Sequence, residues 1–257
     1  MFSAVRRHVA YQLANAPLRA YPFPHVVVPE IFPPEFYPLL RASLPPDEAY
    51  VRLNATGRVG GAYSPARLAF FPGTPAGAAL DAGRAAFWNN FFKALAHEEL
   101  SSWIMAKFYD TLARRFGLGP HKPGVELETE IFLMRDLETY ALGPHSDSPR
   151  KAVSVLFYLP ERGDRPELGT SLYRSKDPAF RCPGGPHHKF EDFERITTIA
   201  YRPNTLFAFP KTEDSFHGVE PVTGAAVRRD VMLIDLKLPR GADGRAAAAT
   251  AREDAMA

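Results

Sequence analysis

The residues of this chain most suited to chemistry are two histidines and one aspartate. His145 and Asp147 lie two positions apart in the sequence GPHSD, which starts at Gly143. In extended backbone, side chains at positions i and i+2 point to the same side, so this imidazole and this carboxylate can face one point. His217, in the later sequence SFHGVEP, is the best candidate for a third group from another strand. The pattern predicts a metal site with His145, Asp147 and His217 as ligands.

The ligand types also indicate which metal is expected. Two histidines and one carboxylate on one side of an ion leave coordination positions open, an arrangement used by non-haem Fe(II) centres that activate oxygen. A His-x-Asp or a His-Gly pair alone is common by chance. The motifs become specific together, because His145 and Asp147 come first, His217 follows with Gly218, and Arg228 comes soon after.

The periodicity of the chain changes from helical to alternating near Gly124. Apolar spacing predicts helices before this point, and alternation with Gly and Pro turns predicts strands after it. The predicted helices cover residues 3–15, 35–44, 76–97 and 101–116. The predicted strands cover residues 125–134, 152–159, 171–173, 196–201, 205–209 and 227–238. Short strands separated by such turns favour a sandwich or jelly roll with helices packed on one sheet.

One large domain is expected for a chain of 257 residues. We expect residues 1–240 to form this domain, with a helical N-terminal part over 1–120 and a jelly-roll core over 121–240. Residues 241–257 are rich in alanine and charge without apolar periodicity, which predicts a disordered tail.

The composition argues against several classes of partner. The 31 basic and 29 acidic residues give a formal charge of only +2, which offers no electrostatic case for nucleic acid or an acidic membrane. The single cysteine, Cys182, excludes an intramolecular disulfide and fits a reducing compartment. The sequence has no apolar run of about 18 residues, so no transmembrane helix is predicted. We therefore expect a cytoplasmic protein that binds neither nucleic acid nor membrane.

The second half of the chain, from about Glu128 to Leu238, resembles the superfamily of 2-oxoglutarate- and Fe(II)-dependent oxygenases, in the branch that contains prolyl hydroxylases. The matching residues are His145-Ser146-Asp147, the sequence VSVLFYL from Val153, Gly169-Thr170, the sequence PNTLFAF from Pro203, His217-Gly218-Val219 and Arg228. The resemblance implies a mainly β fold, a double-stranded β-helix (jelly roll, cupin-like) buttressed by N-terminal α-helices.

The resemblance also implies a reaction. Fe(II) would be bound by the three predicted ligands, and 2-oxoglutarate would be decarboxylated to succinate while dioxygen hydroxylates a substrate. The substrate would be a small molecule, a sugar or a peptide side chain. Sequence motifs do not identify it, because specificity in this superfamily depends on loops around a shared site.

Two residues are expected to hold the co-substrate. By resemblance, Arg228 would pair with its far carboxylate, since a guanidinium can bind two oxygens in a fixed fork. Arg229 is the alternative, and the choice of Arg228 places Met232 and Ile234 on the inward side of the last strand. Tyr140 is expected to supply a hydroxyl to the co-substrate; a tyrosine that only lines the core is the equal alternative.

The aligned position on the strand after the iron motif also bears on this hydroxyl. Relatives often have a tyrosine there, whereas this chain aligns Phe157, with Tyr158 beside it on the opposite side. For this reason the expected hydroxyl comes from Tyr140.

Two other functions remain open at this point. One is a non-catalytic, cupin-like module that binds a metal or a ligand; the arginine argues against it, because such a module needs no co-substrate anchor. The other is a nucleic-acid demethylase on the same scaffold, against which the near-neutral charge argues.

Overall fold

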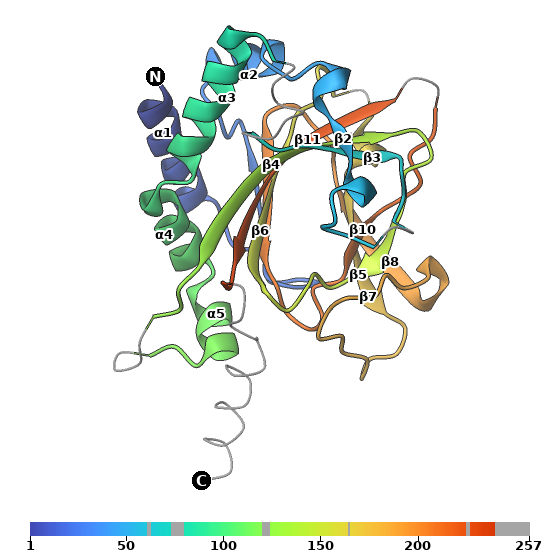
Figure 1. Cartoon of the computed structure of the whole chain (residues 1–257). Coiled ribbons are helices and arrows are strands. Elements are labelled where there is room, and N and C mark those ends of the chain that lie inside the picture. The colour runs from blue at the N-terminus through green and yellow to red at the C-terminus, as the bar shows by residue number, and fades with distance from the viewer. Residues whose placement is uncertain (61–62, 73–79, 120–123, 164, 225–226, 240–257) are drawn as a thin grey trace.

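The computed structural model describes residues 1–60, 63–72, 80–119, 124–163, 165–224 and 227–239, and Figure 1 shows the arrangement of the elements. The helices are α1 (Phe2–Asn15), α2 (Phe36–Ala42), α3 (Ala82–Leu95), α4 (Glu98–Lys107) and α5 (Tyr109–Phe116). The strands are β1 (Val26–Pro29), β2 (Val51–Arg52), β3 (Arg67–Phe70), β4 (Glu128–Leu137), β5 (Leu142–His145), β6 (Lys151–Tyr158), β7 (Thr170–Ser175), β8 (Phe193–Ile199), β9 (Thr205–Pro210), β10 (His217–Val219) and β11 (Arg228–Lys237).

The strands form two antiparallel sheets. The larger has the order β1-β9-β6-β11-β4-β3-β2, and the smaller has the order β5-β10-β7-β8. From β4 to β11 the chain alternates between them: β4, β6, β9 and β11 lie in the larger sheet, and β5, the β7–β8 pair and β10 lie in the smaller. This alternation is the winding of a double-stranded β-helix, so the predicted fold class is confirmed.

The N-terminal part does more than supply helices. Its strands β1, β2 and β3 extend the larger sheet at both edges. Figure 1 shows α1, α3 and α4 along the outer face of this sheet, on the side away from β5, β7, β8 and β10. The predicted helix 101–116 is two helices, α4 and α5, which meet at the buried Phe108.

The larger sheet is buried on both faces. On the outer face, Phe157, Met232 and Ile234 belong to the core that the sheet shares with the helices. On the inner face, Tyr158 and Leu233 belong to the core between the two sheets. Because both faces are covered, nearly every residue of β6 and β11 is buried, and these strands show no alternation of apolar and polar residues.

This double burial makes the predicted inward side of β11 wrong by one residue. Arg228, Met232 and Ile234 were assigned to the inward side, but Met232 and Ile234 face the helices. The same shift affects β6, where Phe157 stacks on Phe32 at 5.2 Å between ring centroids. A shift of one residue moves every side chain to the other face, and a strand that is apolar on both faces gives no signal to fix the choice.

Two sequence expectations concern residues outside the described ranges. The predicted disordered tail, residues 241–257, lies outside them, as does the start of the predicted helix 76–97. Within the described part of the chain, no helix is both long and apolar enough to cross a bilayer.

We predict that Phe157→Ala lowers the free energy of unfolding by about 3–5 kcal/mol, because it leaves a cavity between the larger sheet and the helices. Phe157 is 1% exposed. The matched control is Leu39→Ala on α2, where the side chain is 42% exposed and the expected change is within about 0.5 kcal/mol. Urea denaturation of both variants checks this, and equal losses would contradict the proposed packing.

Candidate metal centre

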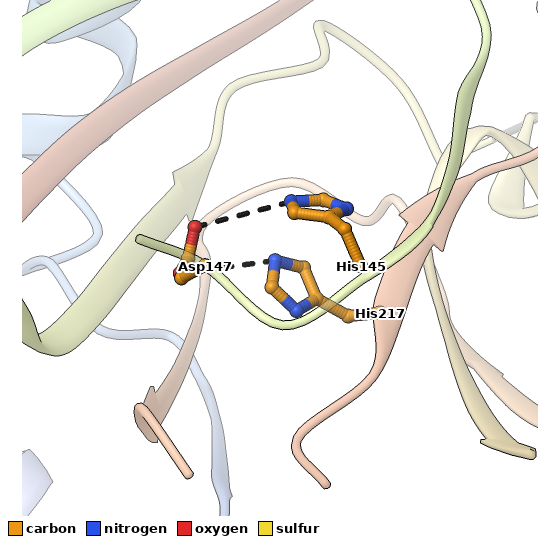
Figure 2. A group of neighbouring side chains, drawn as sticks. All are labelled: His145, Asp147 and His217. Carbon is orange, nitrogen blue, oxygen red and sulfur yellow. Dashed lines mark ion pairs between the residues drawn. The ribbon is translucent and has the colours of Figure 1, made fainter. Parts of the chain in front are cut away.

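The three predicted ligands come together where β5 and β10 pair. His145 ends β5, Asp147 follows it, and His217 begins β10 directly opposite His145 in the antiparallel register. Figure 2 shows the three side chains pointing toward one another. One ligand atom from each lies within 4.8 Å of the others, and all three residues are buried. The Nε2 atoms of both histidines are 3.9 Å from the carboxylate oxygens of Asp147.

Both imidazoles are held by the backbone in the same way. Nδ1 of His145 is 3.0 Å from the carbonyl oxygen of Gly143, and Nδ1 of His217 is 3.0 Å from that of Ser215. A carbonyl can only accept, so each Nδ1 carries the proton and each Nε2 keeps its lone pair for a metal. Burial lowers the pKa of both histidines, which favours the neutral form that binds metals.

The Asp147 carboxylate is fixed by two residues of β6. Ser154 Oγ donates to Oδ2 at 2.8 Å, and Lys151 Nζ lies 3.0 Å from Oδ1. Burial alone would raise the pKa of Asp147, but the positive charge of Lys151 holds this pKa well below its usual range. The carboxylate is therefore ionised and oriented. Ser154 was not found from the sequence, since only its inward position on β6 distinguishes it from other buried serines.

The pairing of β5 with β10 depends on a glycine beside His217. A Cβ atom at Gly218 would lie 2.4 Å from the carbonyl oxygen of Leu142 on β5, closer than side-chain carbons approach backbone. Glycine therefore allows the two strands to meet at this point. The consequence is a separation of 4.3 Å between the ring centroids of His145 and His217.

A cavity of about 550 Å³ opens beside the three ligands, between the two sheets. This volume lies within the range of small-molecule sites. Its apolar lining includes Phe132, Met134, Leu142, Leu156, Phe209 and Leu233.

One end of the cavity carries a cluster of two arginines and one aspartate, here called the inner cluster: Arg67, Asp136 and Arg229. Arg67 donates to both carboxylate oxygens of Asp136, at 2.6 and 2.9 Å, and Arg229 Nη1 donates to Oδ2 at 2.7 Å. All three are buried, and both arginines line the cavity. Two guanidinium groups share one carboxylate, so the inner cluster carries a net charge of +1.

Arg228 lies elsewhere, which corrects its predicted placement. Its side chain is 57% exposed, pairs with Asp47 and does not line the cavity. The neighbouring Arg229 is 1% exposed and faces inward, 3.4 Å from the hydroxyl of Thr170. The physical reason is that the inward-facing residues of β11 lie one position later than predicted, so Arg229 faces the cavity and Arg228 does not.

Tyr140 is fully buried and does not line the cavity. Its hydroxyl lies 2.9 Å from that of Tyr63, which does line it. Tyr63 and Arg67 were not identified as site residues from the sequence. Their only sequence signal is an arginine among apolar residues, in YSPARLAFF.

Comparison with known proteins returned only distant matches. No protein-family model matches the sequence, and no curated protein matches it. The similar solved structures include a prolyl-4-hydroxylase from Pseudomonas putida, 18% identical, which covers 93% of this chain and 100% of that chain with a TM-score of 0.47. They also include an oxidoreductase of the 2OG-Fe(II) oxygenase family from Burkholderia pseudomallei, 12% identical, with 93% of each chain covered and a TM-score of 0.48.

A third similar structure is a prolyl hydroxylase from Trichoplax adhaerens in complex with a fragment of the oxygen degradation domain of hypoxia inducible factor. It is 13% identical, covers 92% of this chain and 90% of that chain, and has a TM-score of 0.46. Identities and TM-scores this low do not transfer a function. The function proposed below therefore rests on the geometry of the site.

We predict that His145→Ala weakens Fe(II) binding by more than about 100-fold, since loss of a ligand should exceed the 10–100-fold cost of losing a group that only orients one. The matched control is His187→Ala, whose ring lies 4.9 Å from that of His145 but outside the ligand set. Anaerobic calorimetric titration measures both affinities. An equal loss in the two variants would mean that the ligand set is wrong.

Proposed function

We propose that the protein is a non-haem, Fe(II)- and 2-oxoglutarate-dependent dioxygenase that hydroxylates a small molecule, a sugar or a peptide side chain. One observation carries the proposal: a set of two histidines and one carboxylate shares its cavity with a buried cluster of net charge +1. A metal-binding module without catalysis has no need of the buried positive cluster. An enzyme that binds a dicarboxylate beside its metal needs both.

The residues present fit the iron that this reaction needs. His145, Asp147 and His217 would hold it through two neutral imidazoles and one ionised carboxylate, all buried and all fixed by neighbouring groups. When bound, iron supplies the oxidising chemistry with dioxygen, and 2-oxoglutarate is converted to succinate and CO2. The protein contributes orientation of the ligands and an apolar cavity wall that excludes water from the reacting atoms.

We propose Arg229, rather than Arg228, as the residue that binds the far carboxylate of 2-oxoglutarate. Arg229 lines the cavity, and the second arginine on Asp136 leaves charge for another carboxylate. A hydroxyl pair supports the same site, since Tyr158 donates to Thr170 at 2.7 Å next to Arg229. A guanidinium can bind a carboxylate in a fork, which orients the co-substrate as well as attracting it.

The first test is release of succinate. The protein supplied with Fe(II), 2-oxoglutarate and air should release succinate, faster when an accepted substrate from a panel of amino acids, sugars and peptides is present. Asp147→Ala should abolish the release, because it removes the only charged ligand. If Fe(II) and 2-oxoglutarate bind but no condition yields succinate, the protein is a binding module and the proposed reaction is wrong.

The second test separates the two arginines. Arg229→Gln should raise the dissociation constant of 2-oxoglutarate by about 10-fold or more, because a hydrogen bond to a charged group contributes roughly 1.5–3 kcal/mol. Arg228→Gln, at the next residue and with the same loss of charge, should leave it nearly unchanged. Anaerobic calorimetry on the Fe(II)-loaded protein measures both, with circular dichroism to check the fold of each variant. The reverse order of effects would assign the role to Arg228.

A further inference from the structure

The cavity has a second charged cluster, built like the inner one and lying at its other end. This outer cluster consists of Arg58, Glu130 and Lys237. Arg58 donates to one carboxylate oxygen of Glu130, and Lys237 donates to the other. All three residues line the cavity. In both clusters a carboxylate of β4 lies between two cations, and one of these cations comes from β11. The other cation is Arg67 at the start of β3 in the inner cluster, and Arg58, nine residues before it, in the outer cluster.

The two clusters are separated along β4. Glu130, Phe132, Met134 and Asp136 follow one another at alternate positions and so share the inner face of the strand. At about 3.3 Å per residue, the Cα atoms of Glu130 and Asp136 lie about 20 Å apart. Phe132 and Met134 line the cavity between them. The cavity is therefore cationic at both ends and apolar in the middle.

The outer cluster adjoins the metal centre through two further residues. Lys237 Nζ lies 3.4 Å from Asp235, which lies 3.1 Å from Lys151, and Lys151 contacts the ligand Asp147. Asp147 is counted with the metal that it would bind. The rest of the network then contains three cations and two carboxylates: Arg58, Lys151, Lys237, Glu130 and Asp235. Its net charge is +1, as in the inner cluster.

The two clusters differ in their access to solvent. The side chains of Arg58, Glu130 and Lys237 are 43%, 26% and 21% exposed, whereas those of Arg67, Asp136 and Arg229 are between 0% and 8% exposed. The outer cluster therefore lies at the mouth of the cavity. The guanidinium of Arg58 lies 4.0 Å from the ring centre of Phe71. Among the described residues, Glu130 is the one side-chain acceptor of this guanidinium, which has further N–H donors.

We propose that the outer cluster binds an anionic group, a carboxylate or a phosphate, of the molecule that is oxidised at the metal centre. This inference rests on the proposed function in one respect: the inner cluster is assigned to the co-substrate, which leaves the outer cluster for the substrate. The substrate class is therefore a small molecule that carries an oxyanion at one end. Its anionic group is held at the mouth, and its neutral part extends along the apolar wall beside the metal ligands.

The test uses binding without catalysis. The metal-free protein, without 2-oxoglutarate, is titrated by calorimetry with inorganic phosphate and, separately, with acetate, which distinguishes the two kinds of oxyanion. Arg58→Gln/Lys237→Gln should weaken binding of the preferred probe by about tenfold or more, since two charged donors are lost. Glu130→Gln should strengthen it, because the carboxylate that competes for both cations is removed.

The matched control also removes two positive charges, but from exposed positions outside the cavity. Arg84→Gln/Lys189→Gln replaces one arginine and one lysine that pair with exposed acidic residues and do not line the cavity. It should leave the affinity for both probes unchanged. Thermal unfolding establishes whether each variant is folded. If the double variant Arg58→Gln/Lys237→Gln does not fold, the stronger binding expected for Glu130→Gln still decides the test.

The outcomes separate this inference from the proposed function. If neither probe binds the parent protein, or if binding depends on Arg229 but not on Arg58 and Lys237, the outer site is overturned. In the Fe(II)-loaded protein with 2-oxoglutarate, candidate substrates that carry a carboxylate should stimulate succinate release more than the corresponding neutral amides. Equal stimulation by acid and amide would also overturn the outer site. If succinate is never released while anion binding still depends on the outer cluster, the anion site stands and the oxygenase assignment fails.

Discussion

The larger sheet must be covered on both faces, and the rest of the molecule is arranged around this constraint. Helices cover the outer face and pack against residues such as Phe157 of β6 and Met232 of β11, in the apolar core that the sheet and the helices share. The smaller sheet covers the inner face with four strands among the described residues, β5, β10, β7 and β8. The space that it does not fill is the cavity, beside which lie the predicted metal ligands: His145 at the end of β5, Asp147 just after it, and His217 at the start of β10.

Sequence patterns predicted the parts of the fold that depend on local signals. The grouping of His145, Asp147 and His217 was predicted because residue type and spacing single them out. The longer strands of the core, β4, β6, β8, β9 and β11, and the shorter β7 were predicted because turns with Gly and Pro separate them, whereas the short β5 and β10 were not. The inward side of β11 was not found. Its residues are apolar on both faces, and only the contacts with helices on one side and the cavity on the other distinguish Arg229 from Arg228.

Two residues of the inner cluster, Arg67 and Asp136, were not identified from the sequence for a related reason. Arg67 and Asp136 are far apart in the sequence, and each looks unremarkable in its own strand. They meet because β3 pairs with β4 in a register that places Arg67 opposite Asp136, and β11 then places Arg229 opposite the same residue. A cluster built across three strands depends on register, which a single sequence specifies only weakly where both faces of the strand are buried.

The long pairing of β4 with β11 has a consequence for which molecules can fit. The two strands are matched residue by residue from Leu137–Arg228 to Glu128–Lys237. Side-chain rotation cannot change the distance between two Cα positions along these paired strands. The backbone therefore sets the spacing between the inner and the outer cluster. With the two clusters binding anions as proposed, the strands would select a substrate by its length, and the apolar residues between the clusters would select it by its shape.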